Sequence, residues 1–252
     1  MRTAGVDLSV AEKGTAAATI EWEAGRARVG EPSLGLADPE LIELLAVAEW
    51  SAIDAPFGWP EPMVAAVHAY AGSGSWPAPD KRSFRLRRTD LYVHDRVLDQ
   101  TGEHLWPLSP STDRISLTAW RLAGLREAAH ERSHVRFDRT GGDQVVEAYP
   151  AAALLLWGLP RAGYKSDPEA REQLLAALEA AAPWLAWEPA AREACADSDD
   201  CLDAVLCALI ARAAAIGLTE LPPAEALDLA RVEGWIHLPR KNCLGELADQ
   251  RA

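Results

Sequence analysis

The chain has 252 residues, of which 49% are hydrophobic and 25% are charged. A chain of this size and composition can bury a large core, which favours a globular fold over a disordered or fibrous one. Its formal net charge of −13 repels polyanions over most of the surface and argues against a broadly basic nucleic-acid-binding protein, so that any contact with nucleic acid requires a local basic patch.

Two further features of the composition bear on where the protein works. No apolar run reaches the length of a membrane span, and the first residues lead into a strand-like segment without a signal-peptide core. We therefore expect a cytoplasmic protein that does not contact membranes. The cysteines Cys195, Cys201, Cys207 and Cys243 lack the paired spacing of a zinc site. They are interpreted as reduced thiols in the core.

The first sixty residues have the patterns of strands followed by one helix. Consecutive strands are predicted at 3–7, 15–22 and 26–29, joined by tight turns. The pair Asp38-Pro39 supplies a cap and a first-turn proline for a helix over 39–48. A short buried strand then starts at Trp50, closes with Asp54 and is stopped by Pro56.

The rest of the chain is predicted to be largely helical. Residues 57–79 are interpreted as loop around a helix at 63–70, and the polar segment 80–111 is interpreted as part of an insertion, at about 72–111, that lies outside the core. Helices are predicted at 112–131, 151–156, 168–182 and 197–216, with Gly217 ending the last. A strand is predicted at 144–150, and a final strand at 232–239.

This order of elements predicts an α/β fold in one domain, with a mixed sheet between helices and the first strand at its centre. In such sheets ligands gather at the carboxyl ends of the strands. Asp7 and Asp54 are expected there, within reach of acids on the helix at 197–216.

That helix begins among four aspartates and is otherwise almost entirely apolar. Acids favour helix N-termini, so capping by Ser198 or Asp199 and the helix dipole account for Asp197, Asp199 and Asp200. Capping accounts poorly for Asp203, which lies about one turn into the apolar segment, where an unpaired charge costs several kcal/mol. Asp200 and Asp203 are three residues apart and therefore share a helix face.

A cluster of Asp7, Asp54, Asp200 and Asp203 would need a compensating positive charge. Carboxylates alone suit Mg²⁺ or Mn²⁺, and two such ions can hydrolyse a phosphodiester. These four aspartates are the predicted metal-binding and catalytic residues. The alternative for Asp7 and Asp54 is a strand-end carboxylate bonded to loop amides.

Six short motifs, kept in order along the chain, resemble the domain of unknown function 429 family, whose members are regarded as predicted ribonuclease H-like nucleases. The motifs are Gly5-Val6-Asp7, Ile53-Asp54-Ala55-Pro56-Phe57-Gly58, Arg88-Thr89-Asp90, Glu147-Ala148-Tyr149-Pro150, Asp200-Cys201-Leu202-Asp203-Ala204 and Glu233-Gly234-Trp235-Ile236. The resemblance implies a five-stranded ribonuclease H-like sheet with Asp7 on the first strand, Asp54 on the fourth, and Asp200 and Asp203 on the closing helix. It also implies a supporting role for Glu147 beside the metal ligands.

The segment 81–90 holds five cations in an otherwise acidic protein. Arginine gives forked contacts to phosphate oxygens, so Lys81, Arg85, Arg87 and Arg88 are predicted to bind substrate, with Arg87 or Arg88 at the rim of the acidic pocket. The alternative is a basic segment that pairs with the protein's own carboxylates.

The preferred function from sequence is a nuclease that depends on a divalent metal, with two ions expected, and acts on nucleic acid or a nucleotide. The alternative is a non-catalytic protein on the same fold that binds nucleic acid or another partner through the basic segment. Phosphotransfer from ATP is disfavoured because the glycine-rich phosphate loops it requires are not evident.

Overall fold

The fold is built around the buried strand β1 (Arg2–Asp7). The computed structural model describes residues 1–76 and 80–249. In these residues the main sheet has seven strands in the order β6-β5-β1-β2-β3-β7, with β4 paired to β2. β1 is antiparallel to β2 (Ala16–Glu23) and parallel to β5 (Trp50–Asp54). The other strands are β3 (Arg26–Val29), β4 (Ser33–Leu34), β6 (Val145–Glu147) and β7 (Leu185–Trp187).

The predicted mixed α/β architecture with a central first strand is confirmed, but the predicted number of five strands is wrong. The additional strands, β4 and β7, have two and three residues. Segments this short carry no readable alternation, so only the pairing with β2 and β3 reveals them. The acid expected on a fourth strand, Asp54, is therefore on β5.

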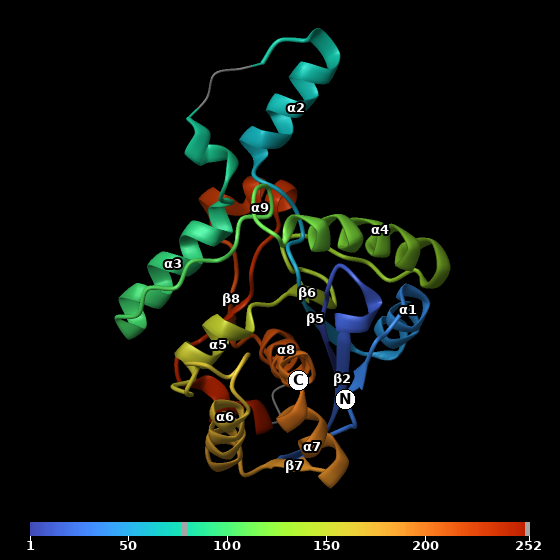
Figure 1. Ribbon diagram of the computed structural model, residues 1–252, viewed down its shortest axis with the longest axis vertical. Helices are drawn as coiled ribbons and strands as arrows, with labels where there is room; N and C mark the ends of the chain where they lie inside the picture. The colour runs from blue at the N-terminus through green and yellow to red at the C-terminus, as the bar shows by residue number, and fades with distance from the viewer. Residues whose placement is uncertain (77–79, 250–252) are drawn as a thin grey trace.

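Helices cover both faces of the sheet (Figure 1). One face packs on α8 (Asp199–Ala215), with α5 (Pro150–Leu156), α6 (Pro168–Ala181) and α7 (Pro189–Asp197) around it. The other packs on α1 (Asp38–Val47) and α4 (Ser116–Ser133). All four cysteines are free and buried, as predicted. Within the described residues, no helix is both long enough and apolar enough to cross a membrane.

The remaining elements of the described residues lie outside the main sheet. They are α2 (Glu61–Ser73), α3 (Arg88–Thr101), α9 (Leu227–Glu233), β8 (Thr219–Glu220), β9 (Leu238–Pro239) and the 3-10 helices Glu12–Gly14, Lys81–Phe84, Ala224–Ala226 and Cys243–Ala248. α2 projects farthest from the sheet (Figure 1).

Two predictions in this region are wrong. The segment 80–111 does not lie wholly outside the core, because α3 buries Val93 and Val97 in a cluster with residues of α5. The predicted final strand at 232–239 starts as the end of α9 and breaks at Gly234, where φ is +87°. Within 232–239, strand pairing is limited to the bridge between Ile236 and Glu147 and to the short β9.

A close backbone approach joins α8 to the sheet. A Cβ atom on Gly5 would lie 2.0 Å from the carbonyl oxygen of Ala204 and 2.2 Å from the amide nitrogen of Ala208. Only glycine therefore allows α8 to lie this close to β1. This contact fixes the height of the first turns of α8 above the end of β1.

We expect Gly5→Ala to destabilise the protein by at least about 3 kcal/mol, because the new methyl group meets backbone atoms that cannot rotate away. Urea denaturation measures the change. Gly25→Ala is the control, because a Cβ there meets nothing within 4 Å; its positive φ of 71° should cost only about 1 kcal/mol. Equal losses in the two variants would contradict the close-packing account.

Candidate functional site

Two aspartates end the two central parallel strands side by side. Asp7 is the last residue of β1, Asp54 is the last residue of β5, and the strand register pairs them directly. Neighbours in register on parallel strands point to the same face. Here the face is the one covered by α8, because Gly5 of β1, two residues before Asp7, is the residue that contacts α8.

Helix α8 brings two more carboxylates to this point. Its N-cap is Ser198, whose hydroxyl oxygen accepts from the amide of Cys201 at 3.3 Å. Asp200 lies in the first turn and lines the same cavity as Asp7, whose pKa its charge helps to raise. Asp203 lies one turn farther and is 0% exposed. Capping and the helix dipole suffice to explain Asp199, but they do not explain a fully buried acid at Asp203.

The partners of Asp203 were not anticipated from the sequence. Its Oδ1 accepts a hydrogen bond of 2.7 Å from the hydroxyl of Tyr164, and its Oδ2 lies 2.6 Å from the ammonium nitrogen of Lys165. Both residues lie in the loop between α5 and α6. This loop has no periodicity and no recognisable motif, so neither contact could be predicted from the sequence.

Burial and mutual repulsion shift the acids of this cluster in one direction. Burial, and then the charges of Asp54 and Asp203, raise the pKa of Asp7 well above its ordinary value. Burial and the charge of Asp203 raise the pKa of Asp54 to about 7. Burial also raises the pKa values of Asp200 and Asp203. The charge of Lys165 lowers each of these pKa values, but the net shifts remain upward. The cluster therefore still lacks positive charge.

The cluster opens into a cavity of about 460 Å³. Its lining includes Asp7, Asp54, Asp200, Arg114 and Lys165. With Asp199, which also lines it, the cavity combines four carboxylates with two cations. An anion with a bound metal ion would find partners for both charges here.

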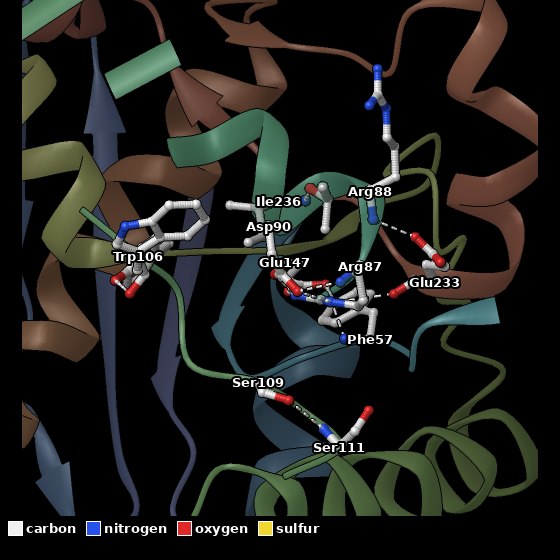
Figure 2. A network of polar contacts seen from close by, with 12 residues as sticks. Phe57, Arg87, Arg88, Asp90, Trp106, Ser109, Ser111, Glu147, Glu233 and Ile236 are labelled. Atoms are coloured by element: carbon white, nitrogen blue, oxygen red, sulfur yellow. Dashed lines mark hydrogen bonds and ion pairs between the residues drawn. The ribbon is translucent and has the colours of Figure 1, made fainter. Parts of the chain in front are cut away.

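A second polar centre lies beside this cavity and is organised by Arg87 (Figure 2). The Arg87 guanidinium donates to both oxygens of Asp90 at 2.8 and 3.2 Å and to both oxygens of Glu147 at 2.7 and 2.9 Å. Its fifth N–H donates to the backbone carbonyl of Glu233 at 3.1 Å. All five donors are thus used inside the protein.

The network around Arg87 also holds the loops next to it. Glu147 accepts from the amide of Phe57 at 2.9 Å, and the carboxylate of Glu233 accepts from the amides of Glu61 and Arg88 at 2.8 and 2.5 Å. A Cβ on Gly234 would lie 2.8 Å from Glu147 Oε2, which explains the glycine. The network therefore ties the segments after β5 and α9 to the start of α3.

The predicted substrate-binding residues do not lie together on one surface. Arg87, which was predicted to bind substrate at the rim of the acidic pocket, is 1% exposed and paired with Asp90 and Glu147. Arg85 and Arg88 are exposed, and Figure 2 shows the Arg88 side chain pointing away from the network. The side chain of Lys81 lies outside the described part of the structure. Glu147 binds Arg87 and lies near Asp54 without joining the carboxylate cluster.

The donor chemistry of the carboxylate cluster fits a hard divalent cation, because buried carboxylates with raised pKa values gain most from one. In the described residues, no three His, Cys, Asp or Glu side chains are already arranged as a set of metal ligands. Binding of a metal ion would therefore require the carboxylate side chains to rotate towards a common point. Catalytic sites commonly tighten in this way when their ligand binds.

The chain matches a family model, described as protein of unknown function (DUF429), over residues 5–227. It belongs to this family, and the predicted resemblance is confirmed at that level. No curated protein and no solved structure matches the chain. The matched range contains all four aspartates of the cluster and also Arg87, Asp90 and Glu147.

The raised pKa of Asp54 predicts a pH dependence of stability. Its pKa is raised from 3.8 to about 7 on folding, so the stability that it contributes is present below about pH 4 and is lost as the pH rises to about 7. In a chelator, Asp54→Asn should therefore gain stability relative to wild type over this range, by up to about 4 kcal/mol. Urea denaturation at several pH values measures the difference, with Asp197→Asn as control. A difference that does not grow with pH would contradict the shift.

The buried pairing of Arg87 predicts a structural role. Arg87→Ala leaves Asp90 and Glu147 buried without their partner, which should cost about 3–5 kcal/mol. Arg88→Ala removes the neighbouring but exposed guanidinium and should change stability by less than about 0.5 kcal/mol. Thermal and urea unfolding compare the two variants. Similar small effects from both would mean that Arg87 is not paired as described.

Proposed function

We propose that this protein is a metal-dependent phosphodiester hydrolase of the ribonuclease H-like class, acting on nucleic acid or on a nucleotide. The observation that carries the proposal is the register of Asp7 and Asp54 on adjacent parallel strands, with Asp200 and Asp203 above them on α8. The core strand order β3-β2-β1-β5-β6, in which only the second strand is antiparallel to the first, supports the fold assignment.

In this proposal Asp7, Asp54 and Asp200 hold Mg²⁺ or Mn²⁺. The bound ion would lower the pKa of a water molecule and neutralise charge on the phosphate. Arg114 and Lys165 line the same cavity and would bind the phosphate oxygens. Asp203, oriented by the hydroxyl of Tyr164, holds the ammonium group of Lys165 at 2.6 Å.

The expectation of two ions changes in the light of this ion pair. The Lys165 ammonium group already supplies a positive charge beside Asp203. We therefore propose one metal ion, with Lys165 in the place of the second cation. The lysine also keeps Asp203 paired, which limits the electrostatic cost of its complete burial.

A non-catalytic binding protein remains the second candidate. The observation in its favour is also the pairing of Asp203 with Lys165, because a carboxylate neutralised by a lysine attracts a metal ion less strongly. On that account the cavity would bind an anionic partner through Arg114 and Lys165. Metal binding distinguishes the two candidates.

The hydrolase proposal predicts that one equivalent of Mn²⁺ binds and stabilises the protein, by about 2.7 kcal/mol at a hundredfold excess over the dissociation constant. Calorimetric titration gives the stoichiometry, and thermal unfolding gives the stabilisation. Asp54→Asn should abolish both effects, whereas Asp197→Asn, an exposed acid at the end of α7, should retain both.

Hydrolysis is tested on the same three proteins with single strands, duplexes and branched junctions in Mg²⁺ and Mn²⁺. Wild type and Asp197→Asn should cleave at least one substrate, and Asp54→Asn should lose at least about a hundredfold in rate. Wild type that neither binds Mn²⁺ nor cleaves any substrate would support the binding protein instead.

A further inference from the structure

A second pocket, of about 340 Å³, adjoins the carboxylate cavity. The two share Asp54, Leu108, Arg114, Ile115 and Lys165 as lining residues, so they form one continuous cleft. Away from the carboxylates the pocket is lined mainly by apolar and aromatic side chains, including Trp106, Tyr149, Ala151 and Ile236. Its size is at the low end of small-molecule sites, about 300–1,000 Å³.

The wall that carries Trp106 is held in place by specific contacts. The Trp106 ring stacks on His94, with centroids 3.5 Å apart and planes at 18°, and Trp106 is 52% exposed where it lines the pocket. Farther along this segment, the buried Ser109 donates to the carbonyl of Arg85 at 2.5 Å, and its amide donates to Asp113 at 2.8 Å. The segment from Trp106 to Arg114 is therefore ordered before any ligand binds.

The polar groups at the base of the pocket are already occupied. Arg87 and Glu147 line it, but the five guanidinium donors and both carboxylate oxygens are used in the network described above. A flat ligand would consequently be held by stacking and shape more than by hydrogen bonds to its edge. Every nucleobase has a face that can stack, so such a site tolerates different bases.

Charge sets the orientation of a ligand in this cleft. Arg114 and Lys165 lie on the boundary between the apolar pocket and the carboxylates. An anionic group attached to the flat ligand would be drawn to that boundary, next to Asp54 and the proposed metal ion. A nucleobase with an adjoining phosphate has this combination of an apolar face and one negative group.

We propose that the pocket lined by Trp106, Tyr149 and Ile236 binds one unpaired nucleobase of a single-stranded nucleic acid and thereby directs the adjoining phosphate to the carboxylate cluster. This rests on the proposed hydrolase function and adds its substrate class. A base pair is too large for the pocket, so duplexes bind only where a base is free. The protein has little preference among bases.

The test measures binding in millimolar Ca²⁺, which neutralises the carboxylates, with intact oligonucleotide verified by electrophoresis. The probes are a short single strand containing 2-aminopurine, the same strand in a duplex, and adenosine monophosphate. We expect the fluorescence of the single strand to be quenched on binding, since 2-aminopurine stacks on Trp106. The duplex and the mononucleotide should bind at least about tenfold more weakly.

Two variants probe the pocket in opposite ways. Trp106→Ala removes the stacking face, and Ala151→Phe fills the pocket without removing any group; each should weaken single-strand binding about tenfold. Trp120→Ala is the matched control, because Trp120 is 62% exposed on α4 and does not line the pocket. Circular dichroism confirms that all three variants are folded.

Several outcomes would overturn the pocket proposal. These are equal binding of the single strand and the duplex, wild-type affinity in both pocket variants, a mononucleotide that binds as tightly as the strand, or no binding of any probe. Metal-dependent cleavage that survives both pocket variants would overturn the pocket but retain the hydrolase. Single-strand binding lost in both variants, without cleavage in any divalent metal, would retain the pocket and overturn the hydrolase.

Discussion

The contact between Gly5 and the backbone of α8 is the constraint on which the site depends. Without a side chain at Gly5 the helix lies directly on β1, with Ala204 and Ala208 against the strand. The first turns of α8 then stand over the ends of β1 and β5, and four acids share one small volume. The carboxylates repel one another, which lowers the stability of the folded protein. Burial of the apolar side chains of α8 between Cys201 and Ala213 offsets this cost.

The neighbouring network has the opposite electrostatic character. Arg87 satisfies Asp90 and Glu147 within the protein, whereas in the described residues the ion pair of the carboxylate cluster is that of Lys165 with Asp203. A fully paired buried network fixes geometry, and an underneutralised cluster retains affinity for cations. The first therefore holds the loops that form the cleft, and the second supplies the chemistry that we propose for it. The two centres meet at Asp54, which is close enough to Glu147 to respond to its charge.

Much of this arrangement was predictable from sequence, and the exceptions have physical causes. Strands with strong local patterns, such as 26–29, and helices with regular apolar spacing, such as the one predicted at 39–48, were found, and register then brings Asp7 and Asp54 together. Lys165 and Tyr164 were missed because their partner, Asp203, is almost forty residues away along the chain and their loop has no local pattern. The burial of Arg87 was not predicted because a basic run gives no sign of which cation is buried. Tertiary pairing decides such roles.

The most direct measurement of the central claim is a crystal structure of the protein with Mn²⁺, using anomalous scattering to locate the ion. The account predicts one strong peak bound by carboxylate oxygens of Asp7 and Asp54 at about 2.0–2.3 Å, with Lys165 still paired to Asp203. A crystal grown in millimolar Mn²⁺ that has no peak between these two aspartates, with their carboxylates unchanged, would contradict it.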